Sequence, residues 1–158
     1  MTITLRLGND LLRHAARLNR WASRHASLGV PFAQARLLAL LEELGPTRVG
    51  DLAQADNSSQ PALTVCVQRL EAAGWVQREG DPRDARASLV SLTRAGREAL
   101  TEVRQARAAV LQPVLDELER RDPAARQRVE AAVAVISDLL DISAHPDMSR
   151  PATTPTNR

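Results

Sequence analysis

The sequence has no lysine, no tyrosine and one cysteine, Cys66. A single cysteine cannot form a disulfide within the chain, so the fold does not rely on cross-links. Aromatic residues make up 2% of the sequence, which disfavours binding of single-stranded nucleic acid on stacked rings. No apolar run approaches the roughly 20 residues of a membrane-spanning helix, and residues 1–10 lack the layout of a signal peptide. We therefore expect a cytoplasmic protein with no membrane partner.

Positive and negative charges are also nearly balanced, because the formal net charge is +2 over 158 residues. The isoelectric point of about 9.8 is nevertheless strongly basic. Without lysine or tyrosine, little titrates between histidine and arginine, so a small excess of arginine moves the isoelectric point far up. Global charge is therefore weak evidence for nucleic-acid binding, and the placement of individual arginines has to decide.

Patterns typical of catalysis or metal binding are missing as well. The sequence has no glycine-rich phosphate loop, no glycine-flanked serine, and no recognisable pairing of cysteine with histidine. His14 and His25 are eleven positions apart on one predicted helix, about three turns, which is too far to share a metal ion. His145 falls in the predicted tail. We therefore expect neither an enzyme nor a bound metal or cofactor.

The sequence does contain a succession of amphipathic segments, in which apolar residues recur every three or four positions. Thr47 is expected to cap a short helix, Gly74 to end a longer one in a left-handed conformation, and Thr93 to cap the next. Pro113 predicts a bend or an offset in the helix after Thr93. The predicted helices cover residues 5–25, 32–44, 47–53, 60–73, 94–118 and 122–140.

The third and fourth predicted helices have the spacing of a helix-turn-helix, in which the second helix enters the major groove by its N-terminal end. Glutamine can bind adenine through two hydrogen bonds, and hydroxyls reach bases or phosphates. The alternative is that Ser58 and Ser59 only cap the helix and that Gln60 is a solvated residue of its first turn. The predicted DNA contacts on this helix are Ser59, Gln60, Thr64 and Gln68.

A turn-rich segment with two arginines follows, between strand-like runs at 75–79 and 87–93. Arg83 and Arg86 are expected at the tip of this hairpin, with Asp84 orienting the Arg86 guanidinium by a charge-assisted bond. A guanidinium held there can enter a narrow minor groove. The alternative is a polar turn with a surface ion pair of little value. Because the hairpin directly follows the helix pair, we favour the DNA role and a mainly α winged helix-turn-helix fold.

The terminal helices, at residues 5–28 and 94–141, carry apolar faces that the small helical core of the lobe at 32–93 cannot cover. A second copy of the chain is the most economical partner for these faces, so we interpret both segments as dimerisation helices. Periodicity ends near residue 141, and the proline-containing segment 143–158 is expected to be a disordered tail. The domain prediction is thus a single unit over 1–142 followed by this tail.

The stretch from 70 to 96 resembles the signature of the MarR family of bacterial winged-helix regulators, at residues 70–76, 78, 81–86 and 92–96. The resemblance implies a homodimer that binds palindromic double-stranded DNA, usually as a repressor released by a phenolic or other anionic ligand, or by oxidation. By matching positions, Arg86 resembles the minor-groove arginine and Asp84 its orienting aspartate. Gln60 and Thr64 resemble contacts of the recognition helix.

Three features leave alternatives open. Many family members have arginine directly after the threonine that matches Thr64, whereas this chain has Val65, which keeps open a protein-interaction module that does not bind DNA. Cys66 suggests a redox-responsive regulator, although a buried and inert thiol is the more common state of a free cysteine. Trp21 could line a ligand cleft, although an aromatic at helical spacing more often belongs to a core or a dimer interface.

Overall fold

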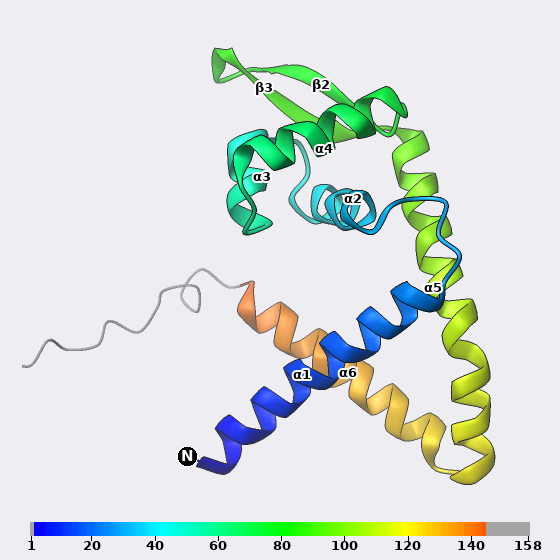
Figure 1. Cartoon of the computed structure of the whole chain (residues 1–158). Helices are drawn as coiled ribbons and strands as arrows, with labels where there is room; N and C mark the ends of the chain where they lie inside the picture. The colour runs from blue at the N-terminus through cyan, green and yellow to red at the C-terminus, as the bar shows by residue number, and fades with distance from the viewer. Residues whose placement is uncertain (1, 145–158) are drawn as a thin grey trace, which may run out of the picture. The chain divides into compact units, whose positions relative to one another are not determined.

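The computed structural model of the chain describes residues 2–144 (Figure 1). The chain divides into two compact units, one ending at Gln112 and one beginning at Pro113. None of the described helices is long and apolar enough to cross a membrane. The elements are α1 (Thr2–His25), α2 (Phe32–Leu44), β1 (Thr47–Arg48), α3 (Val49–Ala55), α4 (Gln60–Ala72), β2 (Val76–Asp81), β3 (Asp84–Leu92), α5 (Arg94–Arg121) and α6 (Ala125–Ser143).

The core of the first unit lies between α2, α3, α4 and one face of the sheet. Leu63, Val67 and Leu70 of α4 are buried there, together with Val90 of β3. Leu44 is 49% exposed, because it is the last residue of α2 and lies at the end of the core, while Leu37 is buried in the same helix. The largest fully buried side chains are Leu37, Leu38, Leu41, Leu52, Val67, Leu70 and Val90.

The short helix does not begin at Thr47 as predicted. Thr47 and Arg48 form strand β1, which pairs antiparallel with Val90 and Leu89 of β3, and α3 begins directly after it, at Val49. The Thr47 hydroxyl donates to the Gly45 carbonyl at 2.8 Å instead of capping the helix. The hairpin strand β3 is thus the middle strand of a three-stranded antiparallel sheet in the order β1-β3-β2.

The turn between α3 and α4 is tight. Asn57 has a φ of 52°, a left-handed conformation that asparagine tolerates better than most residues. Pro61 occupies the first turn of α4, where a missing N–H costs little. The predicted mainly α fold with a helix-turn-helix and a β-hairpin is confirmed.

The hairpin of β2 and β3 has a two-residue turn and an irregular register. Gly80 pairs with Ser88 and Asp81 pairs with Asp84, so β2 advances by one residue where β3 advances by four. The extra residues of β3, 85–87, form a bulge, which bends a strand and redirects its side chains. Arg86 therefore lies in this bulge and not at the hairpin tip as predicted, whereas Arg83 is in the turn.

The junction between α4, the hairpin and α5 is held by a glycine and a threonine. Gly74 has a φ of 73°, which confirms the predicted left-handed cap. Thr93 Oγ1 accepts the Gly96 N–H at 3.0 Å and donates to the Gly74 carbonyl at 2.7 Å, so the predicted cap of α5 is also confirmed. A Cβ atom on Gly96 would lie 2.0 Å from the Trp75 carbonyl oxygen. Only glycine permits this approach of α5 to the hairpin.

The first and last helices expose many apolar side chains. In α1, Leu5, Leu7 and Leu12 are each at least 70% exposed. In α6, Val133 and Leu140 are more than 60% exposed, and Ala125 is its buried residue. The helix α6 extends to Ser143, the first residue of the predicted tail, and residues 145–158 of that tail lie outside the described part of the chain.

Candidate nucleic-acid interface

The N-terminal end of α4 presents polar side chains to solvent. Ser59, Gln60 and Gln68 are exposed, and Thr64 is half-buried with its hydroxyl donating to the Gln60 carbonyl at 2.8 Å. Thr64 therefore offers its free acceptor lone pairs outward, which suit a base amino group better than a phosphate. Val65 lies beside it and is 47% exposed.

The two serines before α4 do not cap it through their side chains. Ser59 occupies the N-cap position without a side-chain hydrogen bond to the helix. The Ser58 hydroxyl oxygen is buried and has no hydrogen-bond partner among the described residues. The interpretation of these serines as caps is therefore wrong, and the exposed Ser59 hydroxyl is free to contact a ligand.

The hairpin presents two exposed arginines, Arg83 in the turn and Arg86 in the bulge. Among the described residues, neither guanidinium lies within salt-bridge distance of a carboxylate. Asp84 does not orient the Arg86 guanidinium as predicted, because its Oδ1 accepts the backbone N–H of Arg86 at 3.1 Å. The bulge turns this N–H toward the carboxylate, and the arginine side chain stays available.

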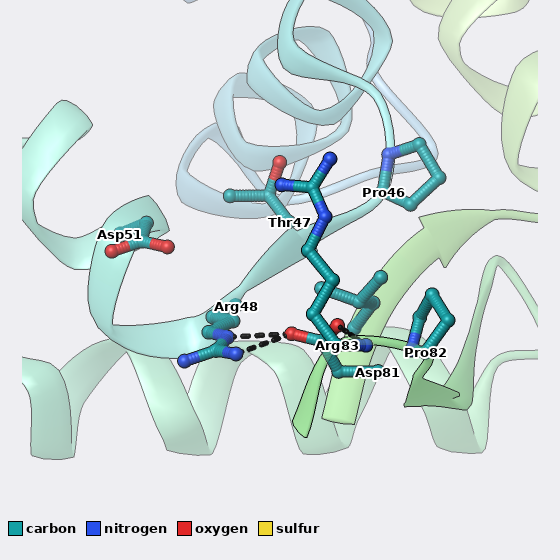
Figure 2. A pocket seen from close by; sticks show the side chains of 8 residues that line it. Pro46, Thr47, Arg48, Asp51, Asp81, Pro82 and Arg83 are labelled. Atoms are coloured by element: carbon teal, nitrogen blue, oxygen red, sulfur yellow. Dashed lines mark hydrogen bonds and ion pairs between the residues drawn. The ribbon is translucent and has the colours of Figure 1, made fainter. Parts of the chain in front are cut away.

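An ion pair with a buried carboxylate, at the turn end of the hairpin, was missed by the sequence interpretation. Figure 2 shows the guanidinium of Arg48 facing the carboxylate of Asp81, with Nε and Nη2 at 2.7 and 2.5 Å from Oδ2. The Asp81 side chain is 6% exposed. The backbone N–H of Arg83, at 2.9 Å, and the guanidinium of Arg48 lower the pKa of Asp81. The same pairing raises the pKa of Arg48.

Part of this arrangement has a sequence signal. Asp81 and Asp84 each stand two positions before an arginine, and a carboxylate at that spacing commonly accepts the backbone N–H two residues on. Arg48 has no such signal, because it lies 33 positions from Asp81 and only the pairing of β1 with β3 brings it there.

Two open cavities border these residues. One, of about 620 Å³, lies between the start of α3 and the hairpin turn (Figure 2). The other, of about 410 Å³, joins the start of α4 to the base of the hairpin. The first is lined by Pro46, Thr47, Arg48, Asp51, Asp81, Pro82, Arg83 and Leu89. The second is lined by Arg48, Val49, Gly50, Asp51, Gln60, Thr64, Arg78, Ala87 and Ser88.

The remaining candidates lie elsewhere in the first unit. The Trp21 ring is half-buried, with its centroid 4.8 Å from that of His25, and its role in ligand binding stays a prediction. Cys66 is half-buried on α4, and burial, followed by the nearby Asp56 carboxylate, raises its pKa. In the described part of the chain, no group of three or more histidine, cysteine, aspartate or glutamate residues is placed to hold a metal ion.

A helix-turn-helix with a polar N-terminal end on its second helix, next to an arginine-bearing hairpin, defines the class of winged-helix DNA-binding proteins. The MarR family model matches residues 32–88 of the chain. An uncharacterized HTH-type transcriptional regulator of Mycobacterium bovis, Mb0904, is 31% identical over 139 residues, which cover 87% of this chain and 95% of that protein. The chain belongs to the MarR family and is a transcriptional regulator.

Other proteins agree with this assignment. The HTH-type regulator YxaD of Bacillus subtilis is 35% identical over 81 residues, covering 51% of this chain and 57% of that protein. The crystal structure of RV1404 from Mycobacterium tuberculosis has a TM-score of 0.67 and 25% identity, covering 92% of this chain and 97% of that one. Apo MarR of E. coli has a TM-score of 0.57 and 26% identity, covering 89% and 96%. Mb0904 and YxaD are both described as transcriptional regulators, not as enzymes.

Proposed function

We propose that this regulator binds a palindromic double-stranded DNA site as a cytoplasmic homodimer and represses transcription until a phenolic or other anionic ligand releases it. The observation that carries the DNA-binding part is the pair of exposed arginines, Arg83 and Arg86, without carboxylate partners among the described residues, beside the exposed polar end of α4.

The N-terminal end of α4 would read base edges in the major groove. Gln60 can bind adenine through two hydrogen bonds, and Ser59 and Gln68 add exposed polar groups on the same helix. Val65 replaces a charged contact by an apolar one, which suits the methyl group of thymine. The wing would place Arg86 in the minor groove, with Arg83 near a phosphate.

The homodimer proposal rests on the exposed apolar residues of the terminal helices. Leucines such as Leu7 and Leu140 are 70% and 64% exposed in the single chain, and a second copy is a partner that can cover such faces. We propose dimerisation segments at 5–28 and 94–141 and a DNA-binding lobe at 32–93. Sedimentation velocity on the full chain tests this, since a monomeric mass at micromolar concentration would contradict it.

The ligand would act by changing the spacing between the two lobes. Half-sites in consecutive major grooves are one helical turn apart, so a dimer whose recognition helices are spaced differently cannot occupy both. A ligand that binds the mismatched spacing better shifts the equilibrium away from DNA. Trp21 is the candidate for its binding site that the sequence suggested.

Gel-shift titration with DNA from the region upstream of its own gene tests the DNA-binding proposal. Arg86→Ala should weaken binding about tenfold, because it removes the guanidinium that the wing would place in the minor groove. Arg36→Gln is the matched control, because Arg36 is a 54% exposed arginine of α2 outside the predicted DNA contacts and the dimerisation segments, and it should bind as the wild type does. Binding that survives unchanged in Arg86→Ala would contradict the role of the wing arginine, and no salt-dependent binding of the wild type would favour the protein-interaction alternative.

The redox alternative has its own measurement. If Cys66 were a sensor, peroxide would abolish DNA binding in the wild type but not in Cys66→Ser. The half-buried thiol and its raised pKa favour an inert thiol, so we expect peroxide to leave DNA binding of both proteins unchanged.

A further inference from the structure

The two wing arginines share a local arrangement. Asp81 Oδ1 accepts the backbone N–H of Arg83 at 2.9 Å, and Asp84 Oδ1 accepts the backbone N–H of Arg86 at 3.1 Å. A carboxylate bound to the N–H two residues later fixes the backbone of the turn between them. Each aspartate therefore sets the backbone from which one arginine side chain leaves the hairpin.

The second oxygen of each aspartate faces the same guanidinium, that of Arg48. Asp81 Oδ2 lies 2.5 Å from Arg48 Nη2 and 2.7 Å from its Nε (Figure 2). Asp84 Oδ2 lies 3.6 Å from the same Nη2. Arg48 comes from outside the hairpin, because it belongs to β1 and occupies the N-cap position of α3. Its guanidinium therefore joins both arginine-bearing turns to the helix-turn-helix.

We propose that Arg48 is a positioning residue of the wing, which holds Arg83 and Arg86 in the orientation for DNA by binding Asp81 and Asp84 together. This inference rests on the proposed DNA-binding function. A guanidinium suits the role because it is planar and can donate to two carboxylates at once, whereas an ammonium group acts as a point charge. The near-complete burial of Asp81 makes the pairing obligatory, since a buried carboxylate needs a partner.

The competing explanation is that Arg48, 42% exposed, contacts a DNA phosphate itself. Asp81→Asn separates the two explanations, because they predict changes of opposite sign in DNA affinity. The substitution removes a negative charge from a DNA-facing hairpin and frees Arg48, so simple electrostatics predicts tighter binding. Loss of the wing tether predicts weaker binding, because Arg83 and Arg86 lose their fixed orientation.

The experiment measures affinity by fluorescence anisotropy, with a labelled duplex carrying the site footprinted in the upstream region. The matched control is Asp56→Asn, because Asp56 also forms an ion pair of 2.7 Å with an arginine, Arg36, and its side chain is 7% exposed. Both substitutions remove one charge from a buried carboxylate. We expect Asp81→Asn to bind about tenfold more weakly, the size of one lost arginine contact, and Asp56→Asn to bind at least as tightly as the wild type.

The coupling between Arg86 and the tether separates positioning from general destabilisation. If the tether acts through the wing, Arg86→Ala should weaken binding about tenfold in the wild type and less than about twofold in the Asp81→Asn background. If the losses of DNA affinity of the two single variants add in full in the double variant, the inference is overturned while the DNA-binding function stands. The same holds if Asp81→Asn binds DNA more tightly than the wild type. A wild type that binds no DNA would instead overturn the function.

A second variant covers the case in which Asp81→Asn loses its helical circular dichroism. Arg48→Lys keeps a positive charge beside Asp81 but cannot bridge both carboxylates as a guanidinium does. We expect it to fold, to bind several-fold more weakly and to reduce the effect of Arg86→Ala. Wild-type affinity in Arg48→Lys, with the full effect of Arg86→Ala retained, would refute the positioning role.

Discussion

Gly96 allows a sharp test of how α5 is joined to the hairpin. An alanine Cβ at this position would lie 2.0 Å from the Trp75 carbonyl oxygen, 2.9 Å from its carbon and 3.3 Å from Leu92 Cδ2. Relief of the first contact requires α5 and the Trp75 backbone to separate by more than about 1 Å. The same oxygen accepts the Thr93 N–H at 3.0 Å, so this movement also stretches a hydrogen bond at the start of α5.

The expected effect is a loss of about 1–4 kcal/mol in the free energy of unfolding. Overpacking costs about 1–3 kcal/mol and a weakened hydrogen bond about 1 kcal/mol, whereas replacing glycine in a helix returns at most about 1 kcal/mol. Urea unfolding followed by circular dichroism measures the difference. Gly50→Ala is the control, because a Cβ there meets nothing within 4 Å and should stabilise α3 slightly. A Gly96→Ala protein as stable as the wild type would refute the proposed close approach.

The remaining predictions concern two titrating groups. The lowered pKa of Asp81 means that its ionised form stabilises the folded state above the ordinary value of 3.8, and that this contribution disappears as the pH falls through the lower folded-state pKa. The urea midpoint of Asp81→Asn should therefore fall less steeply than that of the wild type below pH 3.8, and equal slopes would contradict the assignment. Burial raises the pKa of Cys66. Iodoacetamide should therefore alkylate Cys66 in the folded protein more slowly than it alkylates the thiol of glutathione, and the alkylation rate of Cys66 should recover in urea. Alkylation as fast as that of glutathione would show a reactive thiol.

The elements that were predicted well are those with local signals. The α2 boundaries, Phe32–Leu44, follow from glycine and proline on either side, and the end of α4 follows from Gly74. Thr93 was identified as a cap because a hydroxyl at the start of an apolar helix has few other roles. The position of α4 as the second helix of the helix-turn-helix also needed only a short helix and a turn before it.

The errors concern features set by pairing between distant segments. A two-residue strand such as β1 has no periodicity of its own, and only the free edge of β3 makes Thr47 and Arg48 extended. The bulge at 85–87 depends on the register of β2 against β3, so the position of Arg86 was not legible from its neighbours. The prediction that Asp84 binds the Arg86 guanidinium was wrong for the same reason, since Arg48 reaches Asp84 only after the sheet has formed.

Arg48 takes part both in local structure and in pairing between distant segments. Its backbone pairs with Leu89 of the hairpin, its position caps α3, and its side chain binds Asp81 at the base of the turn. The helix α3 packs against α4. A change in the orientation of the wing should therefore also move α4, unless the contact of Arg48 with the hairpin breaks. Major-groove and minor-groove contacts made by one lobe should then form together, which favours a DNA site whose two grooves have one fixed relative geometry over a site that matches in base sequence alone.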